Sequence, residues 1–255
     1  MKNLTRDSIE IIPLKGIGLI KEGDNLAKLI VEAAKAQGVD IEDGDIIVVA
    51  HKIVSKAEGR IVDLKTITPS KFALRASKLL NKDPRIIEVI LRESKRIVRM
   101  VKGHLICETR HGFICANAGV DKSNVEGEDF VALLPKNPDA SAEAIRKGIK
   151  ELVNADVAVI ISDTFGRPWR SGQVDVAIGV SGLVPLKDYR GTKDMFNLSL
   201  KVTVICVADE LASAAELVMN KSNGVPVALI KGYPYIKGEG SFKDLVKQNK
   251  YNLFP

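Results

Sequence analysis

The sequence predicts an α+β fold in which mixed or antiparallel sheets pack against helices. Leu105–Glu108 and Phe113–Ala116 flank a short turn, as in a β-hairpin, and Leu198–Val207 alternates apolar and polar residues, as in a half-buried strand. Two apolar runs, Asp45–Ala50 and Asp156–Ile161, have the pattern of fully buried strands, which parallel sheets also contain. A doubly wound parallel sheet therefore stays open as the alternative.

Capping residues predict where the helices begin. The expected helices are, in chain order, Asn25–Gln37 after Asp24, a helix from Ser70 to about Leu80, one from Pro84 after Asp83, one from Asp139 to Leu152, and Ala208–Met219. A loop at residues 220–224 and a last strand at Val225–Ile230 follow.

Length and composition indicate a water-soluble protein that could form one large domain or two intertwined lobes, and we assign residues 1–255 to a single domain. The chain is 45% apolar, and no window approaches the roughly 20 apolar residues of a membrane span. The first residues lack the apolar stretch of a secretory signal, and the three cysteines form no CxxC motif. We therefore expect a cytoplasmic protein with no membrane partner.

The net charge of +6 is spread along the chain and does not identify a nucleic-acid-binding protein. No helix-turn-helix, RNA-recognition or zinc-finger pattern occurs, and aromatic residues make up only 5% of the chain. A polyanionic small substrate together with a nucleoside triphosphate explains the basic balance equally well.

Two aspartates, each directly after an apolar strand-like run, are the most informative feature. Asp121 follows Gly112–Val120, and Asp163 follows Val157–Ser162 and opens a polar, glycine-containing segment. Magnesium and manganese prefer one or two carboxylates completed by phosphate oxygens and water. Either aspartate alone is more simply a turn cap, but the pair favours a metal-bound phosphate. Arg167, Arg170 and the basic segment Lys52–Arg60 would face a second anion.

Other patterns are weaker. Neither GxxxxGK[ST], GxGxxG nor GxSxG occurs, although Gly16, Gly18 and Gly23 with Lys21 would let backbone amides approach a phosphate. His104, Cys107, His111 and Cys115 lack the knuckle spacing of structural zinc, so the two cysteines are expected to be small buried residues.

The segments NAGVDKSNV, SDTFGRPWRSGQ, HKIVSKAEGR and VADELASAAELVM resemble those of the GTP-dependent coenzyme F420 gamma-glutamyl ligases. The similarity runs from Ile12 to Ser241 with the motifs in one order. It implies an α+β, two-lobed fold and an intertwined homodimer. Mycobacterial relatives carry a fused C-terminal flavin-binding domain, which this sequence is expected to lack because it stops at Pro255.

The resemblance also implies site residues. Asp121, Asp163 and Thr164 correspond to metal ligands for Mg²⁺ or Mn²⁺, and K⁺ is a further candidate cofactor. The implied nucleotide-binding residues are Ile17, Gly18, Leu19, Ile20, His51, Lys52, Lys56, Asn124, Met219, Asn220, Lys221, Ser222, Asn223, Gly224 and Val225. Lys56 is also expected to act in catalysis. From residue type alone, Arg167 and Arg170 are the catalytic candidates for holding the acceptor's carboxylate or phosphodiester.

One segment departs from the family pattern. Archaeal members carry a Gly-Glu-Gly-Gly-Asp-Gly loop with a metal-binding Glu, whereas residues 220–224 contain no carboxylate. Either Lys221 supplies the positive charge of the second cation, or Asp209 or Glu210 reaches in.

The implied reaction is a GTP-dependent, gamma-linked addition of L-glutamate to F420-0 and F420-1 through an acyl phosphate. GTP, L-glutamate and F420-0 would be the small-molecule partners, with no nucleic acid. The alternatives are a metal-dependent phosphohydrolase acting on nucleotides and a basic nucleic-acid-binding protein.

Overall fold

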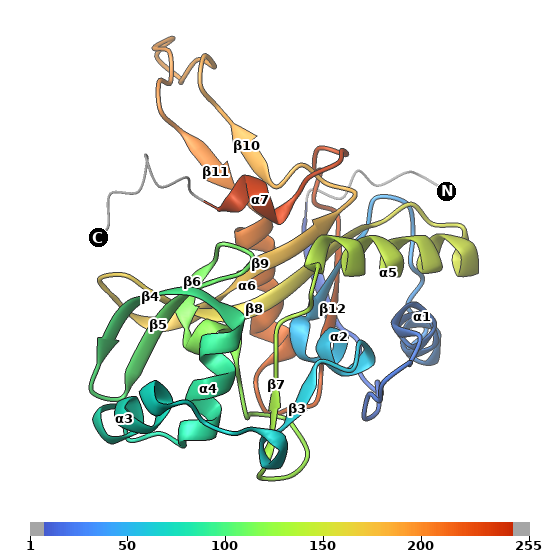
Figure 1. The fold of residues 1–255 in the computed structure, drawn as a ribbon. Coiled ribbons are helices and arrows are strands. Elements are labelled where there is room, and N and C mark those ends of the chain that lie inside the picture. The colour runs from blue at the N-terminus through green and yellow to red at the C-terminus, as the bar shows by residue number, and fades with distance from the viewer. Residues whose placement is uncertain (1–7, 247–255) are drawn as a thin grey trace.

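The structure is a computed structural model that describes residues 8–246. A five-stranded mixed sheet forms its centre. Its strands lie in the order β1 (Glu10–Pro13), β12 (Val227–Lys231), β2 (Ile46–Ala50), β8 (Ala158–Arg167) and β9 (Arg170–Ser181). Only β2 and β8 run parallel to each other; the other neighbouring strands of this sheet are antiparallel (Figure 1).

The central strands are buried on both faces. Along β2, Ile47 and Val49 face helices α1 (Leu26–Ala36) and α5 (Pro138–Val153), whereas Ile46 and Val48 face helix α6 (Val207–Met219). Successive side chains of a strand point to opposite faces, so the unbroken apolar run at Ile46–Val49 fills two cores at once. Figure 1 shows α5 and α6 on opposite sides of the sheet.

Capping explains the helix boundaries and corrects two of the predicted ones. Asn25, not Asp24, caps α1 by accepting a hydrogen bond from the Lys28 amide, and Asp24 instead closes the preceding turn through the Lys21 amide. Asn137, not Asp139, caps α5. The Asp139 carboxylate instead accepts hydrogen bonds from the Val180 amide and the Ser241 hydroxyl. These bonds connect α5 to β9 and to the short α7 (Phe242–Leu245).

A smaller antiparallel sheet packs against two helices. It contains β4 (Ser94–Val101), β5 (His104–Thr109) and β6 (Ile114–Ala116), and it packs against α3 (Lys71–Leu80) and α4 (Pro84–Glu93) through a separate apolar cluster. The hairpin of β5 and β6 confirms the predicted turn. Ser70 and Asp83 cap α3 and α4 as expected, and Pro84 occupies the first position of α4, where its missing N–H leaves no bond unmade.

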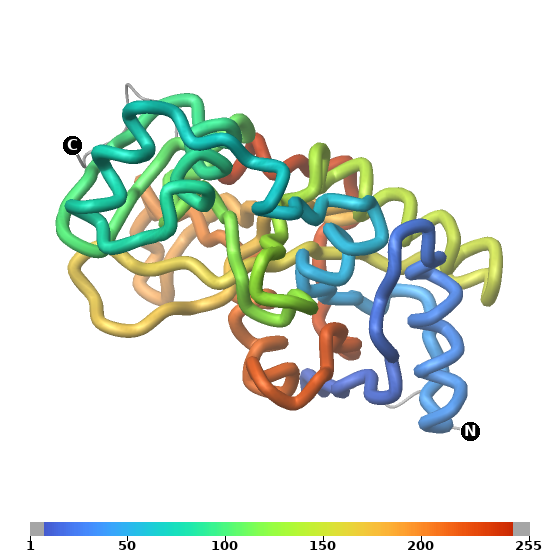
Figure 2. The backbone as a smooth tube through the Cα atoms, turned by 60° about the horizontal axis from the view of Figure 1, so that its bottom comes forward, coloured from blue at the N-terminus to red at the C-terminus, as the bar shows by residue number. Residues whose placement is uncertain are grey.

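The remaining elements are short. Helix α2 (His51–Ala57) follows β2 directly, and the other short elements are β3 (Ile61–Asp63), which pairs with β7 (Phe130–Ala132), the 3₁₀ turns η1 (Leu64–Thr66) and η2 (Asn117–Gly119), and β10 (Leu186–Asp188), which pairs with β11 (Val204–Cys206). Viewed from below, the small sheet and its helices lie beside the central sheet (Figure 2).

Two strand predictions are wrong in extent. The segment expected as the strand Leu198–Val207 is a strand only at Val204–Cys206, because residues 189–203 form a protruding arm on which Leu198 and Val202 are exposed. The strand expected to end at Ile161 continues to Arg167 and turns into β9, so the predicted polar loop after Asp163 is a long β-hairpin.

The predicted α+β class is confirmed. Within residues 8–246, no helix has both the length and the apolar character needed to cross a membrane.

The close approach of α5 to β9 at Gly179 gives a stability prediction. A Cβ at this position would lie 2.5 Å from the Pro138 Cβ and 2.6 Å from the Pro138 carbonyl carbon. Because backbone cannot move aside as a flexible side chain can, Gly179→Ala should destabilise the fold by about 1–3 kcal/mol. Urea unfolding measures this. Gly166→Ala is the matched control, since its Cβ would meet no atom within 4 Å; equal midpoints for the two variants would contradict the prediction.

Candidate functional site

The parallel pairing of β2 with β8 brings the first predicted site residues together. Ala50 pairs with Ser162, so the residues that follow, His51 and Asp163, leave the same edge of the sheet. The His51 ring is buried, and its Nε2 lies 3.2 Å from Asp163 Oδ1, within ion-pair distance but not aligned for a hydrogen bond. This contact places the predicted metal ligand Asp163 against the start of α2.

Lys52, the residue after His51 on α2, contacts Asp121, the other predicted metal ligand. Lys52 Nζ lies 2.7 Å from Asp121 Oδ2 and also donates to the Ser123 hydroxyl, while the Ser123 amide donates to Asp121 Oδ1 over 2.8 Å. Burial by itself raises the pKa of Asp121, but the bonds from Lys52 and Ser123 outweigh it and hold this pKa below its usual range. Asp121 is therefore a preformed carboxylate.

A third group lies on the β8–β9 hairpin. Thr164 pairs with Asp175, and its hydroxyl donates to Asp175 Oδ1 over 2.7 Å. Lys221, from the loop after α6, donates to the same Asp175 oxygen over 2.7 Å and to the Thr164 hydroxyl. Of the sequence alternatives for this position, Lys221 is the one that contacts Thr164; Asp209 accepts a hydrogen bond from the Ala177 amide, and Glu210 is exposed.

Asp175 was not predicted from the sequence. It is only 3% exposed and accepts from the Ser162 hydroxyl as well as from Thr164 and Lys221. In the sequence, Asp175 alternates with Val174 and Val176 as a solvent-facing residue of a half-buried strand would, so its burial carries no local signal. A charge within a buried strand needs a partner, and such positions are often functional.

These three groups follow one another in a line along the sheet edge, joined by polar contacts and, between Lys52 and His51, by the chain itself. Asp121 binds Lys52, the adjacent His51 contacts Asp163, and the Thr164 amide donates to Asp163 Oδ1 before the line continues to Asp175 and Lys221. Carboxylate and hydroxyl oxygens of this kind suit Mg²⁺ or Mn²⁺. In the described part of the chain, no three His, Cys, Asp or Glu side chains gather closely enough to hold a metal by themselves. Substrate oxygens would have to complete the coordination.

Lys56 lies one helical turn beyond Lys52 on α2. Burial lowers the pKa of Lys56, and the neighbouring Lys52 charge lowers it further, although Glu126 acts in the opposite direction. Two ammonium groups thus lie close together beside the Asp121 turn. An anion that binds between them would relieve their repulsion.

The remaining predicted nucleotide-binding residues lie in loops around α2. In the first loop Ile17 and Ile20 are buried whereas Gly18 and Leu19 are exposed, and the Gly23 amide that ends this loop donates to the Ala57 carbonyl of α2. Asn124 is exposed beside the Asp121 turn. In the loop after α6, Met219 and Val225 are buried and residues 220–224 are exposed.

Arg167 and Arg170 lie apart from this line of contacts within the chain. Both are at the tip of the β8–β9 hairpin, and Arg167 donates to the Ser171 and Gly172 carbonyls of the turn. Arg167 is four residues beyond Asp163, which is roughly 13 Å along an extended strand. The structure does not bring these arginines to the aspartates of the same chain.

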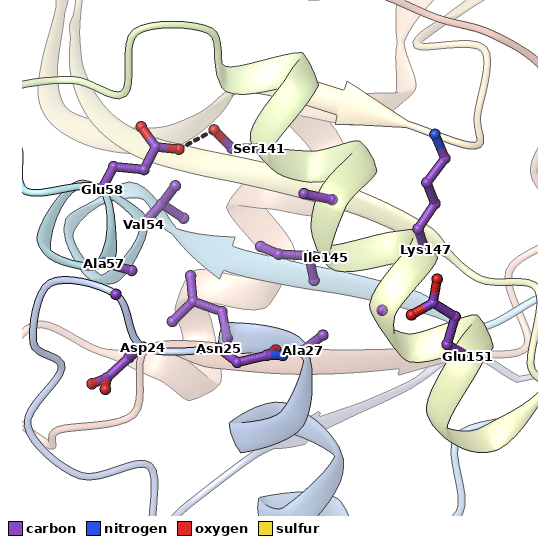
Figure 3. A pocket seen from close by; sticks show the side chains of 14 residues that line it. Asp24, Asn25, Ala27, Val54, Ala57, Glu58, Ser141, Ile145, Lys147 and Glu151 are labelled. Atoms are coloured by element: carbon purple, nitrogen blue, oxygen red, sulfur yellow. Dashed lines mark hydrogen bonds between the residues drawn. The ribbon is translucent and has the colours of Figure 1, made fainter.

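A cavity of about 490 Å³ lies on the other side of α2. Figure 3 shows Val54, Ala57 and Glu58 of α2 facing Ser141 and Ile145 of α5, with a hydrogen bond between Ser141 and Glu58. Gly23 lines it, but none of the residues that the family resemblance implies for metal or nucleotide binding does. Helix α2 therefore carries its lysines and His51 on one face and borders this cavity with another. Because the carboxylates and hydroxyls described above lie at the first face, that face is the candidate reaction site.

Comparison with known proteins agrees with the motifs. A family model described as F420-0:Gamma-glutamyl ligase matches residues 16–232. The chain belongs to this family. Archaeal proteins named coenzyme F420:L-glutamate ligase are similar to this chain over nearly their whole length. The protein of Methanothermobacter thermautotrophicus is 46% identical over 249 residues (96% of this chain, 98% of the relative), and that of Methanocaldococcus jannaschii is also 46% identical over 249 residues (96% of each). The protein of Archaeoglobus fulgidus is 41% identical over 246 residues (96% of each).

The Lys52 contact gives a prediction for Asp121. In Lys52→Met the burial of Asp121 remains but the ammonium is lost, so the pKa of Asp121 should rise above its value in the unchanged protein. Carbon-13 NMR titration of the carboxyl group measures it. Lys122→Met removes the same charge from an exposed neighbour and should leave this pKa nearly unchanged. Equal pKa values in both variants would show that Lys52 does not set the charge state of Asp121.

Proposed function

We propose that the protein is a ligase that joins L-glutamate through a gamma-linked amide to F420-0, and then to F420-1, with GTP as the energy source. The observation that supports this most directly is the line of contacts from Asp121 to Asp175, which gathers carboxylates, hydroxyls and ammonium groups at one sheet edge. It occurs in a chain of the F420-0:gamma-glutamyl ligase family.

The reaction needs an activated carboxylate, because amide formation from a free carboxylate is uphill in water. A carboxylate oxygen of the F420 precursor attacks the γ-phosphorus of GTP, the bond to the β-phosphate oxygen breaks, and GDP leaves. The glutamate amine then attacks the acyl carbon, loses a proton, and the carbon–oxygen bond to phosphate breaks. Lys52 and Lys56 are placed to bind the phosphates, where positive charge stabilises transfer.

Asp121, Asp163 and Thr164 are the residues that would hold Mg²⁺ or Mn²⁺. The bound ion would neutralise phosphate charge and orient the phosphoryl group for in-line transfer. Lys52 binds Asp121 through Oδ2, so this ammonium must exchange its carboxylate for a phosphate oxygen as the nucleotide arrives. The apolar side chain of Leu19, in the first loop, is 82% exposed and offers a surface for the guanine ring of GTP. We assign no residue to K⁺.

Arg167 and Arg170 stay candidates for binding the acceptor's carboxylate or phosphodiester. Their place at a hairpin tip favours a site on a second copy of the chain over one on their own. In a homodimer, the tip of one subunit would then complete the acceptor site of the other.

The direct test is mass spectrometry of the product from F420-0, GTP, L-glutamate and Mn²⁺. A product heavier by one glutamyl residue, formed with GDP and phosphate, is the expected result. GTP hydrolysis that is equal with and without glutamate and F420-0, with no amide product, would instead favour a phosphohydrolase. Salt-sensitive duplex binding without any GTP turnover would favour a nucleic-acid-binding protein.

Asp163→Asn should abolish ligase turnover while leaving the fold intact. The substitution removes a charge from a side chain at the sheet edge but keeps its volume, so it weakens metal binding more than packing. Product formation at several Mn²⁺ concentrations, together with circular dichroism, measures both effects. Asp40→Asn changes an exposed carboxylate and serves as the control. A near-normal rate at low Mn²⁺ would refute a metal-binding role for Asp163.

We also expect a homodimer. The exposed apolar side chains of the 189–203 arm, which include Met195, Phe196, Leu198 and Val202, would be covered in an intertwined pair. Light scattering should give about twice the chain mass of 27.7 kDa. A single species near the mass of one chain would contradict this expectation.

A further inference from the structure

Lys221 lies in a set of oxygen atoms that resembles the environment of a bound cation. Its Nζ donates to Asp175 Oδ1 over 2.7 Å and to the Thr164 hydroxyl, and it lies 3.8 Å from Glu216 Oε1. Two carboxylates and a hydroxyl thus surround one positive charge. Hard cations select the same donors.

Asp175 requires a positive partner. Its side chain is only 5% exposed, and its other two contacts, the hydroxyls of Ser162 and Thr164, are neutral. A buried carboxylate is costly without a compensating charge. Among residues 8–246, Lys221 is the one cationic side chain within ion-pair distance of Asp175.

The loop that carries Lys221 is held in an unfavourable conformation. Asn220 has φ 55° and ψ 177°, a region that is essentially restricted to glycine and is strained for other residues. This turn brings Lys221 back onto the β8–β9 hairpin. Lys221 is itself 57% exposed, so its ammonium reaches a buried carboxylate from a solvent-exposed loop.

We propose that Thr164 and Asp175 form a cation site in which the Lys221 ammonium takes the place of a second metal ion. The tethered charge joins the 220–224 loop to the hairpin and fixes the Thr164 hydroxyl against Asp175. A protonated lysine acts on a phosphate as a point charge but cannot coordinate a metal. An action of Lys221 on a nucleotide phosphate rests on the proposed function, whereas the exclusion of a metal ion by Lys221 does not.

The proposal predicts that removing the ammonium opens the site to a divalent cation. Electron paramagnetic resonance counts Mn²⁺ bound to the full chain without nucleotide. Lys221→Ala should bind one more Mn²⁺ per chain than the unchanged protein does. Lys221→Glu should bind that additional ion more tightly, because it adds a carboxylate. Lys201→Ala removes an equal charge from the exposed arm and should bind Mn²⁺ as the unchanged protein does.

A second substitution locates the additional ion. In Lys221→Ala combined with Asp175→Asn, the extra Mn²⁺ should be lost. Lys221→Gln keeps the side-chain length without the charge and gives the same readout if Lys221→Ala does not fold. Mn²⁺ binding by the Lys221 variants that matches the unchanged protein, or an extra ion that survives Asp175→Asn, would overturn the proposal. Because nucleotide is absent, a failure of the ligase assay would refute the proposed function and leave this count unaffected.

Discussion

The parallel pairing of β2 with β8 is the constraint on which the rest of the site depends. Both strands are buried on two faces, so their register is fixed by two apolar cores rather than by one. Since parallel strands end at the same edge, this register places His51 beside Asp163. A slip of one residue would exchange Ser162 for Asp163 and turn the carboxylate to the other face of the sheet. The position of Asp163 against α2 therefore follows from hydrophobic packing, whereas Asp121 is held by its backbone bridge to Ala132.

The β8–β9 hairpin converts this edge into a functional surface. Its register shifts between the pairs Ile161–Gly179 and Ser162–Ala177, which leaves Ile178 as the extra residue of a bulge. Bulges redirect the side chains that follow them. Beyond this one, the strand passes from purely apolar residues to Ser162, Asp163 and Thr164, with Asp175 opposite Thr164. The bulge thus lies at the boundary between the part of the hairpin that stabilises the core and the part that carries polar chemistry.

Sequence alone predicted the features that depend on local chemistry. Ser70 and Asp83 cap helices as expected, and the apolar run at Ile46–Val49 is a central strand. The misassignments have physical causes. Asp24 and Asn25 are both good caps, and only the tertiary position of the Lys21 turn decides between them. The composition of the segment Asp163–Arg167 predicts a loop, because this part of the strand is stabilised by pairing with β9 and not by its own residue types. Asp175 could not be recognised because its partner Lys221 is 46 residues away and the contact exists only in the folded chain.

The charges at the three aspartates are arranged differently, and this bears on how the site would respond to a nucleotide. Asp121 and Asp175 each bind a lysine ammonium, whereas Asp163 contacts an imidazole and a backbone amide, both on its Oδ1 atom. A divalent ion competes with an ammonium for the same carboxylate oxygen, so the two lysine-bound aspartates resist a metal until the ammonium has another anion to bind. The triphosphate oxygens of the proposed GTP substrate would provide that anion. Lys52, on a partly exposed Asp121, can transfer to phosphate readily, whereas Lys221 would leave a buried carboxylate uncompensated. The first lysine is therefore suited to exchange with a metal–nucleotide complex, and the second to remain in place.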